Sequence, residues 1–132
     1  MDENQQELIF KLSMYEQQIR NLQQQLEAVE KGILDMNNLN LGLDELIGSK
    51  DKEILAPIGR GIFVKTKLLS EELTVDVGDK NFVKKGIPDT KKIITEQIKK
   101  LEEIKKELND SLDSLSQEMT SMINGIQEEN SI

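Results

Sequence analysis

The sequence predicts a mainly α fold in which two long antiparallel helices form a coiled coil and are linked by two small β-hairpins. Apolar residues recur in alternating steps of three and four on both sides of the centre, as in a coiled-coil seam. Between these segments, residues 54–85 are rich in Ile, Val, Phe and Thr and are interrupted by Gly, Asp and Asn, which is typical of short strands joined by turns. Aromatic residues make up 3% of the chain and charged residues 32%, which suits a narrow seam better than a compact core.

The first helix is expected at about residues 3–47. Asn40 falls on its seam. Either Asn40 is a polar seam residue that fixes the register, or the apolar stripe shifts locally onto Leu39 and Leu46. Gly48 is suited to ending the helix, because glycine readily adopts the left-handed conformation that follows a helix. The predicted seam residues are Leu8, Leu12, Tyr15, Ile19, Leu22, Leu26, Val29, Ile33, Met36, Leu43 and Ile47.

The β-hairpins are expected at about residues 53–85. Pro57 has no N–H to donate, so the first strand must lie at an edge or carry a bulge. Glycine-rich turn signals occur at residues 59–61 and 78–81. Four strands this short bury little apolar surface, and small sheets need to be covered. We therefore expect the strands to pair with strands of other chains and to form an oligomer.

The second helix is expected at about residues 89–127, which gives one domain over residues 1–132. Lys105 occupies the one missing position of its seam, beside Ile104. The two helices are of about equal length, so antiparallel folding brings the ends of the chain together, with Leu8 near Ile126. The predicted seam residues are Ile94, Ile98, Leu101, Leu108, Leu112, Leu115, Met119, Met122 and Ile126.

The composition argues against enzymes and metal sites. The chain has no Cys and no His, so disulfides and thiolate sites are excluded, and the commonest general base and zinc ligand are missing. No catalytic, cofactor-binding or calcium-loop motif is found. The net charge of −8 disfavours nucleic acid and anionic membranes as partners. The first residues do not resemble a signal peptide and no apolar stretch reaches membrane-spanning length, so a cytoplasmic protein is expected.

Near both ends of the chain, apolar residues occupy more than the seam face of each helix. Two helices cannot bury all of them, so the tip is expected to be an interaction surface. Methionine is flexible, which suits contact with many partners. The alternative is an ordinary frayed coiled-coil end. The candidate tip residues are Ile9, Phe10, Met119, Met122, Ile123 and Ile126.

Three segments carry a resemblance to a known family. LAPIGRGIFVKTKL (residues 55–68) resembles the strand–Gly-x-Gly–strand segment of the prefoldin (GimC) family. TVDVGDKNFVKK (74–85) resembles its second hairpin and LQQQLEAVE (22–30) its first helix. The turn at 78–81 is less glycine-rich than in the family. Two hairpins mark the α class, the resemblance covers essentially the whole chain, and the Lys/Glu/Ile-rich composition resembles that of archaeal members.

The resemblance implies a hexamer of two α-class and four β-class subunits whose hairpins assemble into an intersubunit β-barrel. Such a chaperone holds unfolded proteins at its coiled-coil tips without ATP and passes them to a group II chaperonin. On this basis the tip residues above are candidate client contacts. A structural tether that binds one dedicated partner remains the alternative. The candidate subunit-interface residues are Ile54, Ile58, Phe63, Val64, Val75, Val77, Phe82 and Val83.

Overall fold

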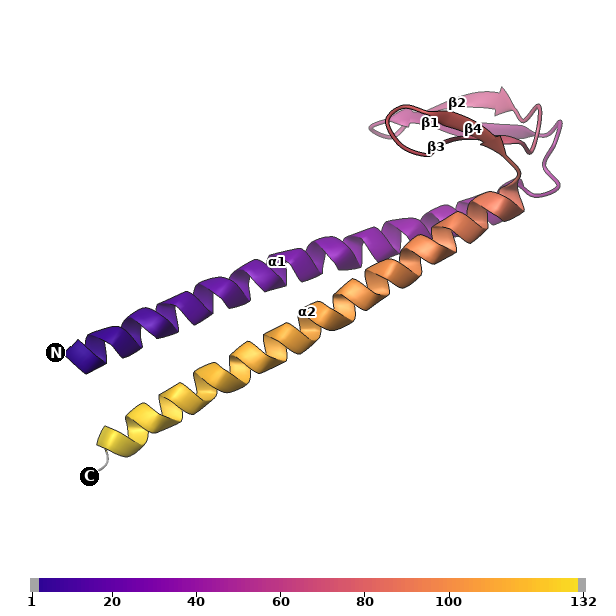
Figure 1. Cartoon of the computed structure of the whole chain (residues 1–132). Coiled ribbons are helices and arrows are strands. Elements are labelled where there is room, and N and C mark those ends of the chain that lie inside the picture. Colours follow the sequence, from indigo (N-terminus) through magenta and orange to yellow (C-terminus); the bar gives the residue numbers. More distant parts are fainter. Residues whose placement is uncertain (1–2, 131–132) are drawn as a thin grey trace. The chain divides into compact units, whose positions relative to one another are not determined.

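The computed structural model describes the backbone of residues 3–130 and the side chains of residues 3–125. The two long helices and the two strand pairs between them confirm the predicted fold class. The chain divides into a terminal unit, residues 1–33 and 100–132, and a central unit, residues 34–99. In chain order the elements are α1 (Glu3–Leu46), β1 (Glu53–Gly59), β2 (Ile62–Lys67), β3 (Leu73–Asp76), β4 (Phe82–Lys85) and α2 (Ile87–Asn130) (Figure 1).

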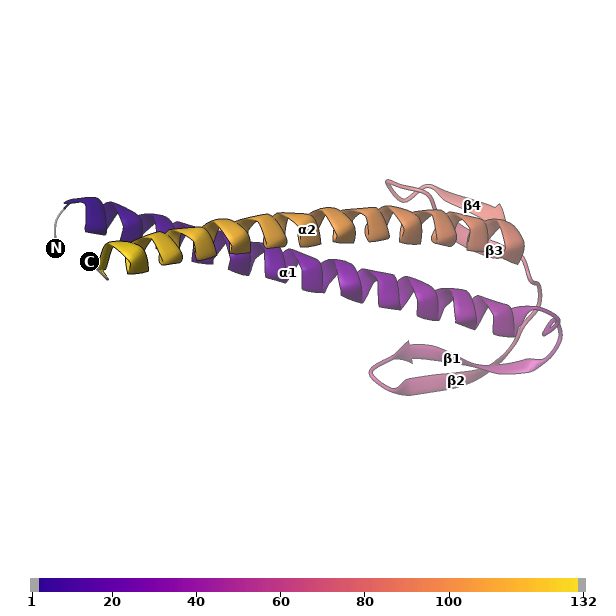
Figure 2. The same ribbon diagram turned by 90° about the horizontal axis from the view of Figure 1, so that it is seen from below.

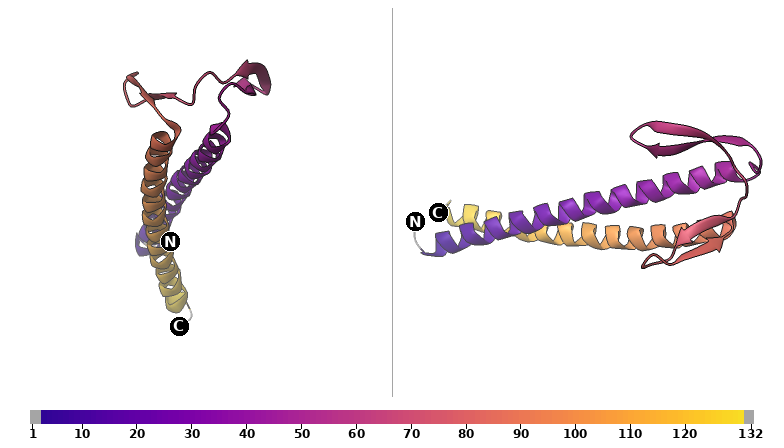
Figure 3. Two further views of the ribbon diagram at one scale, coloured as in Figure 1. Left: turned by 90° about the vertical axis from the view of Figure 1, so that its right-hand side faces the viewer. Right: turned by 90° about the horizontal axis from the view of Figure 1, so that it is seen from above.

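In the terminal unit the two helices run antiparallel, and the predicted seam is the half-buried line between them. A Cβ placed on Gly32 would lie 3.5 Å from Leu101 Cδ1. One turn further along α2, Lys105 Nζ lies 3.7 Å from Glu30 Oε1. Lys105 therefore occupies the seam position itself, while the neighbouring Ile104 is exposed. The antiparallel course brings the first turns of α1 and the last turns of α2 to the same end of the helix pair (Figure 3), and Leu8 and Met122 line one hollow there.

The central unit holds a small core of Leu43, Ile87 and Ile94, against which Leu46 and Leu73 pack. Asn40 is half-buried, and its Oδ1 is buried without a hydrogen-bond partner among the described residues. Because Leu39 is exposed, the apolar stripe does not shift onto it. Asn40 is therefore a polar seam residue, and the predicted shift of the stripe occurs only at Leu46, which is half-buried against the core while Ile47 is exposed.

The helix boundaries in the central unit have identifiable local causes. α1 ends at Leu46, so Ile47, which was predicted on the seam, lies beyond the helix and is exposed. Gly48 then adopts a positive φ of 77°, and its N–H donates to Glu71 Oε1 at 2.7 Å. At the start of α2, the buried Thr90 lies inside the first turn and its hydroxyl donates to the Gly86 carbonyl at 2.9 Å.

The strands form two separate antiparallel hairpins, β1–β2 and β3–β4 (Figure 2). The register of β1–β2 shifts between Pro57 and Gly59, which confirms a bulge as one of the two outcomes predicted from Pro57. In the second hairpin Asp79 and Lys80 both have positive φ values, 49° and 61°. The Asn81 N–H donates to the Gly78 carbonyl at 2.9 Å. These values define a type I′ turn, whose twist matches that of the flanking strands.

Candidate functional site

The apolar residues near the end of α1 lie largely outside the seam. Ile9 is exposed and Phe10 is 66% exposed. A single exposed apolar side chain is ordinary, but neighbouring ones indicate a contact surface. On α2, Ile123 is also exposed, whereas Met119 and Met122 are half-buried on the seam. Ile126 lies outside the described side chains.

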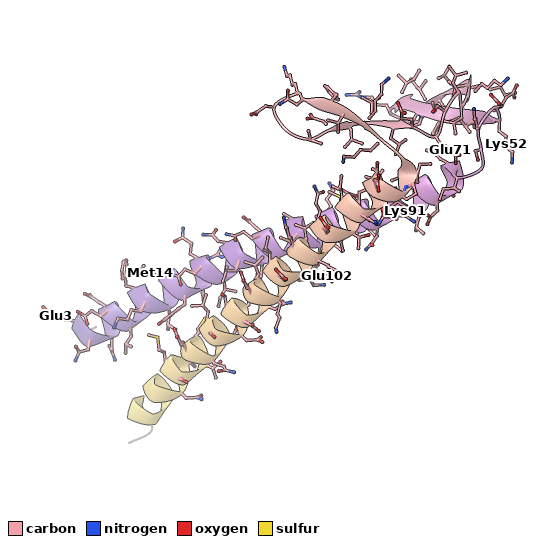
Figure 4. All side chains as sticks on the ribbon, turned by 45° about the vertical axis from the view of Figure 1, so that its right-hand side comes forward. Glu3, Met14, Lys52, Glu71, Lys91 and Glu102 are labelled. Atoms are coloured by element: carbon pink, nitrogen blue, oxygen red, sulfur yellow. The ribbon has the colours of Figure 1, made fainter. Side chains whose placement is uncertain are left out.

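Met14 belongs to the same region and was missed by the sequence analysis. Met14 is 47% exposed. It lies one helical turn beyond Phe10, so the two side chains are neighbours on α1. Figure 4 labels Met14 on this helix. Met14 also lines a hollow together with Leu8, Tyr15 and Met122. The spacing of four from Phe10 was the signal that could have identified it. We call Ile9, Phe10 and Met14 the terminal apolar surface.

Tyr15 connects the two helices in this region. Glu118 on α2 lies nearby, and its capacity to accept a hydrogen bond, together with its negative charge, raises the pKa of Tyr15 above its usual 10.0. The physical reason is that a carboxylate accepts a hydrogen bond from the neutral phenol and repels the phenolate. The raised pKa therefore reports how close Tyr15 on α1 lies to Glu118 on α2.

The second candidate surface is formed by the hairpins. Most of the candidate interface residues are exposed, and they occur on all four strands or directly beside them. Leu55, Ile62 and Leu69 are exposed too and were not among the candidates. Ile54 and Val75 are half-buried instead. The exposed candidates are Ile58, Phe63, Val64, Val77, Phe82 and Val83.

Val75 faces the helices of its own chain. It lines a hollow with Leu43 and Ile94, and Leu73 lines the same hollow. The cross-strand partner of Val75 is Val83. A substitution of Val75 would therefore change the lining of this hollow as well as any contact with another chain.

Each hairpin also has unsatisfied backbone edges. Both sheets have only two strands, so every strand has one edge with no hydrogen-bonded neighbour among the described residues. Such edges, with exposed apolar side chains beside them, are suited to pairing with another chain.

The described residues offer no place for a metal ion, since no group of three or more His, Cys, Asp and Glu side chains comes together among them. Within the same part of the chain, neither helix combines the length and apolar character needed to cross a membrane.

Comparison with known proteins gives consistent results. Residues 15–131 match the family of prefoldin subunits. Prefoldin subunit alpha of Methanobrevibacter smithii is 34% identical over 110 residues, which cover 83% of this chain and 70% of that protein. The alpha subunit of Methanococcus aeolicus is 33% identical over 108 residues, covering 80% and 71%. The solved structure of filamentous PFD from Methanocaldococcus jannaschii superposes with a TM-score of 0.75, covering 86% of this chain and 95% of that chain at 22% identity. That likeness is one of fold.

Proposed function

This chain belongs to the prefoldin family, as an α-class subunit, and from that membership we propose that it is part of a hexameric, ATP-independent chaperone. Family membership implies a chaperone-type role. In the proposal, two copies of this chain and four β-class subunits assemble in the cytoplasm. The complex holds unfolded proteins and passes them to a group II chaperonin. The chain is not an enzyme and uses no cofactor.

The observation that carries the holding function is the terminal apolar surface. Ile9, Phe10 and Met14 expose apolar side chains within two turns of α1. Unfolded proteins expose apolar side chains in no fixed arrangement, so a receptor for them needs apolar groups without a shaped pocket. Met14 adds flexibility, because its unbranched side chain adapts to different neighbours.

The hairpins support the assembly part of the proposal. Apolar side chains such as Phe63 and Phe82 are exposed beside strand edges that have no partner within the described chain. Burying them against other subunits in an intersubunit β-barrel would satisfy both the side chains and the backbone. Several chains in one complex would then act on one client together, which raises retention through effective concentration.

The test compares complexes that have been reconstituted with a β-class subunit and shown by sizing to be assembled. One carries Ile9→Ser with Phe10→Ser. The matched control carries Leu34→Ser with Ile104→Ser, because these apolar residues are also exposed on α1 and α2. A chemically denatured test protein is diluted into each complex without nucleotide, and its aggregation is followed by light scattering. We expect the control to protect as well as the original complex and the Ile9/Phe10 variant to lose most of its protection.

Two results would contradict the proposal. Full protection by the Ile9/Phe10 variant would show that clients contact other residues. If the original complex assembles but protects no unrelated denatured protein, the chain is better described as a tether with one dedicated partner.

A further inference from the structure

A continuous groove follows one side of the helix pair in the terminal unit. It consists of three hollows that share lining residues. Ser114 lines the first and the second, Gln18 the first and the third, and Tyr15 and Met122 the second and the third. The shared residues come from both helices, so the groove runs along the junction between α1 and α2.

The groove has an apolar floor and one wall of small side chains. Leu22, Leu115 and Met122 are half-buried seam residues that line it from below. On the α2 side it is bordered by Ser111 and Ser114, and further along by Ser121. Because serine side chains are short, they leave room beside the seam that a leucine at the same position would fill.

Charge distinguishes the terminal unit, which contains this groove, from the central unit. Residues 1–33 and 100–132 contain 14 acidic and six basic residues, whereas residues 34–99 contain 11 of each. The whole net charge of −8 therefore belongs to the terminal unit. No Lys or Arg follows Lys106 in the sequence.

Two carboxylates of this unit border the groove, those of Asp110 and Glu118. Neither forms an ion pair among the described residues; the four ion pairs found there involve Glu30, Asp44, Glu53 and Glu72. Lys11 is the only basic residue along the groove, in the third hollow. The groove thus offers apolar contact and unneutralised negative charge at the same place.

We infer that this groove binds extended segments of unfolded proteins in which Lys or Arg is interspersed with apolar residues. This inference rests on the proposed function and names the class of client segment that the complex prefers. Asp110 and Glu118 are eight positions apart on one helix, roughly 12 Å at 1.5 Å per residue. In an extended chain, residues about four apart span a similar distance and lie on the same face. A segment with two basic residues at that spacing places both charges on the carboxylates and its apolar side chains on the floor.

The test uses the reconstituted complex and two fluorescently labelled peptides. Both peptides have the same leucines, and one carries two lysines about four residues apart where the other carries two glutamates. Binding is measured by fluorescence anisotropy. We expect the lysine peptide to bind more tightly, and the preference to shrink as salt screens the charges.

Substitutions then locate the preference. Asp110→Asn with Glu118→Gln keeps the shape of the groove and removes its charge, and we expect it to weaken binding of the lysine peptide about fivefold, as two partly exposed charge pairs would. Asp113→Asn with Glu107→Gln is the control, because it also removes two negative charges, but from exposed positions of α2 that do not line the groove.

A second pair of variants tests the shape of the groove. Ser114→Leu narrows the groove and is expected to weaken the binding of both peptides. Ser116→Leu, at an exposed position outside the groove, is expected to leave the binding of both peptides unchanged.

The outcomes separate this inference from the proposed function. If the two charge variants behave alike, or if the lysine and glutamate peptides bind equally, the charge-selective groove is wrong, even when the complex still protects denatured proteins. If the lysine peptide binds as expected but the complex protects no denatured protein, the groove stands and the holding function fails.

Discussion

At the scale of single residues, Tyr15 allows a direct measurement of the contact between α1 and α2. It is the only tyrosine in a chain without tryptophan, so the ultraviolet absorbance of its phenolate can be titrated without interference. We expect a midpoint above 10.0, because Glu118 can accept a hydrogen bond and is negatively charged, and both raise the pKa of Tyr15. Glu118→Gln should lower the midpoint, since it removes the charge.

The sign of the pH effect on stability follows from the same shift. The pKa of Tyr15 is raised by folding, so the proximity of Glu118 stabilises the folded chain below the unfolded pKa of about 10, and this contribution is lost as the pH rises through the folded value. Glu107→Gln is the matched control, as it removes a negative charge elsewhere on α2. Equal midpoints in the two variants would mean that Tyr15 and Glu118 do not interact in solution.

Residues that deviate from the seam pattern were the hardest to place from sequence. The position of Lys105 followed from the heptad spacing, but its proximity to Glu30, with Nζ 3.7 Å from Oε1, depends on how the two helices align. Met14 was missed because it lies off the seam, and its exposure indicates a contact surface only together with the exposed Phe10 and the hollow that contains Met122. A seam pattern describes one face of a helix and gives no information on how side chains beyond that face group together.

At the scale of elements, the polar seam residue Asn40 is expected to lower stability. Its Oδ1 is buried without a hydrogen-bond partner among the described residues, and such a group costs about 1 to 3 kcal/mol. Asn40→Leu should therefore raise the free energy of unfolding by about 1 to 2 kcal/mol, measured by urea denaturation followed by circular dichroism. Asn37→Leu, at an exposed position one turn earlier, should change it little.

A loss of stability in the Asn40→Leu variant would show that this amide has a partner in solution or in the assembly. If stability rises but the variant forms species of mixed size, Asn40 contributes to the specificity of helix alignment, as polar seam residues do in other coiled coils.

The elements themselves could be predicted because each depends on local chemistry. The seam periodicity indicated both helices, Pro57 indicated the bulge in β1, and Gly48 marked the end of α1. Which face of each hairpin is covered could not be predicted, because Ile62 and Phe63 point to opposite faces of β2 and yet both are exposed. A strand pattern gives the alternation of side chains, but burial depends on what lies above each face.

At the scale of the whole molecule, the exposed hairpin residues are expected to determine whether the chain assembles. Phe63 and Phe82 are 58% and 62% exposed, so replacing either by Asp should leave the folding of the single chain unchanged. In an intersubunit β-barrel the same substitution would bury an unpaired carboxylate, at a cost of about 3 kcal/mol or more, which is at least a hundredfold in the assembly constant. We therefore expect Phe63→Asp and Phe82→Asp to keep the helical circular dichroism signal and to prevent formation of the hexamer with a β-class subunit. Light scattering coupled to size-exclusion chromatography measures the size of the assembly directly.

Val75→Asp is a less specific variant, because Val75 also lines the hollow with Leu43 and Ile94. Ile104→Asp introduces the same charge at an exposed apolar position of α2 and should assemble normally. A normal hexamer with both Phe variants would place the assembly contacts outside the hairpin residues proposed for them.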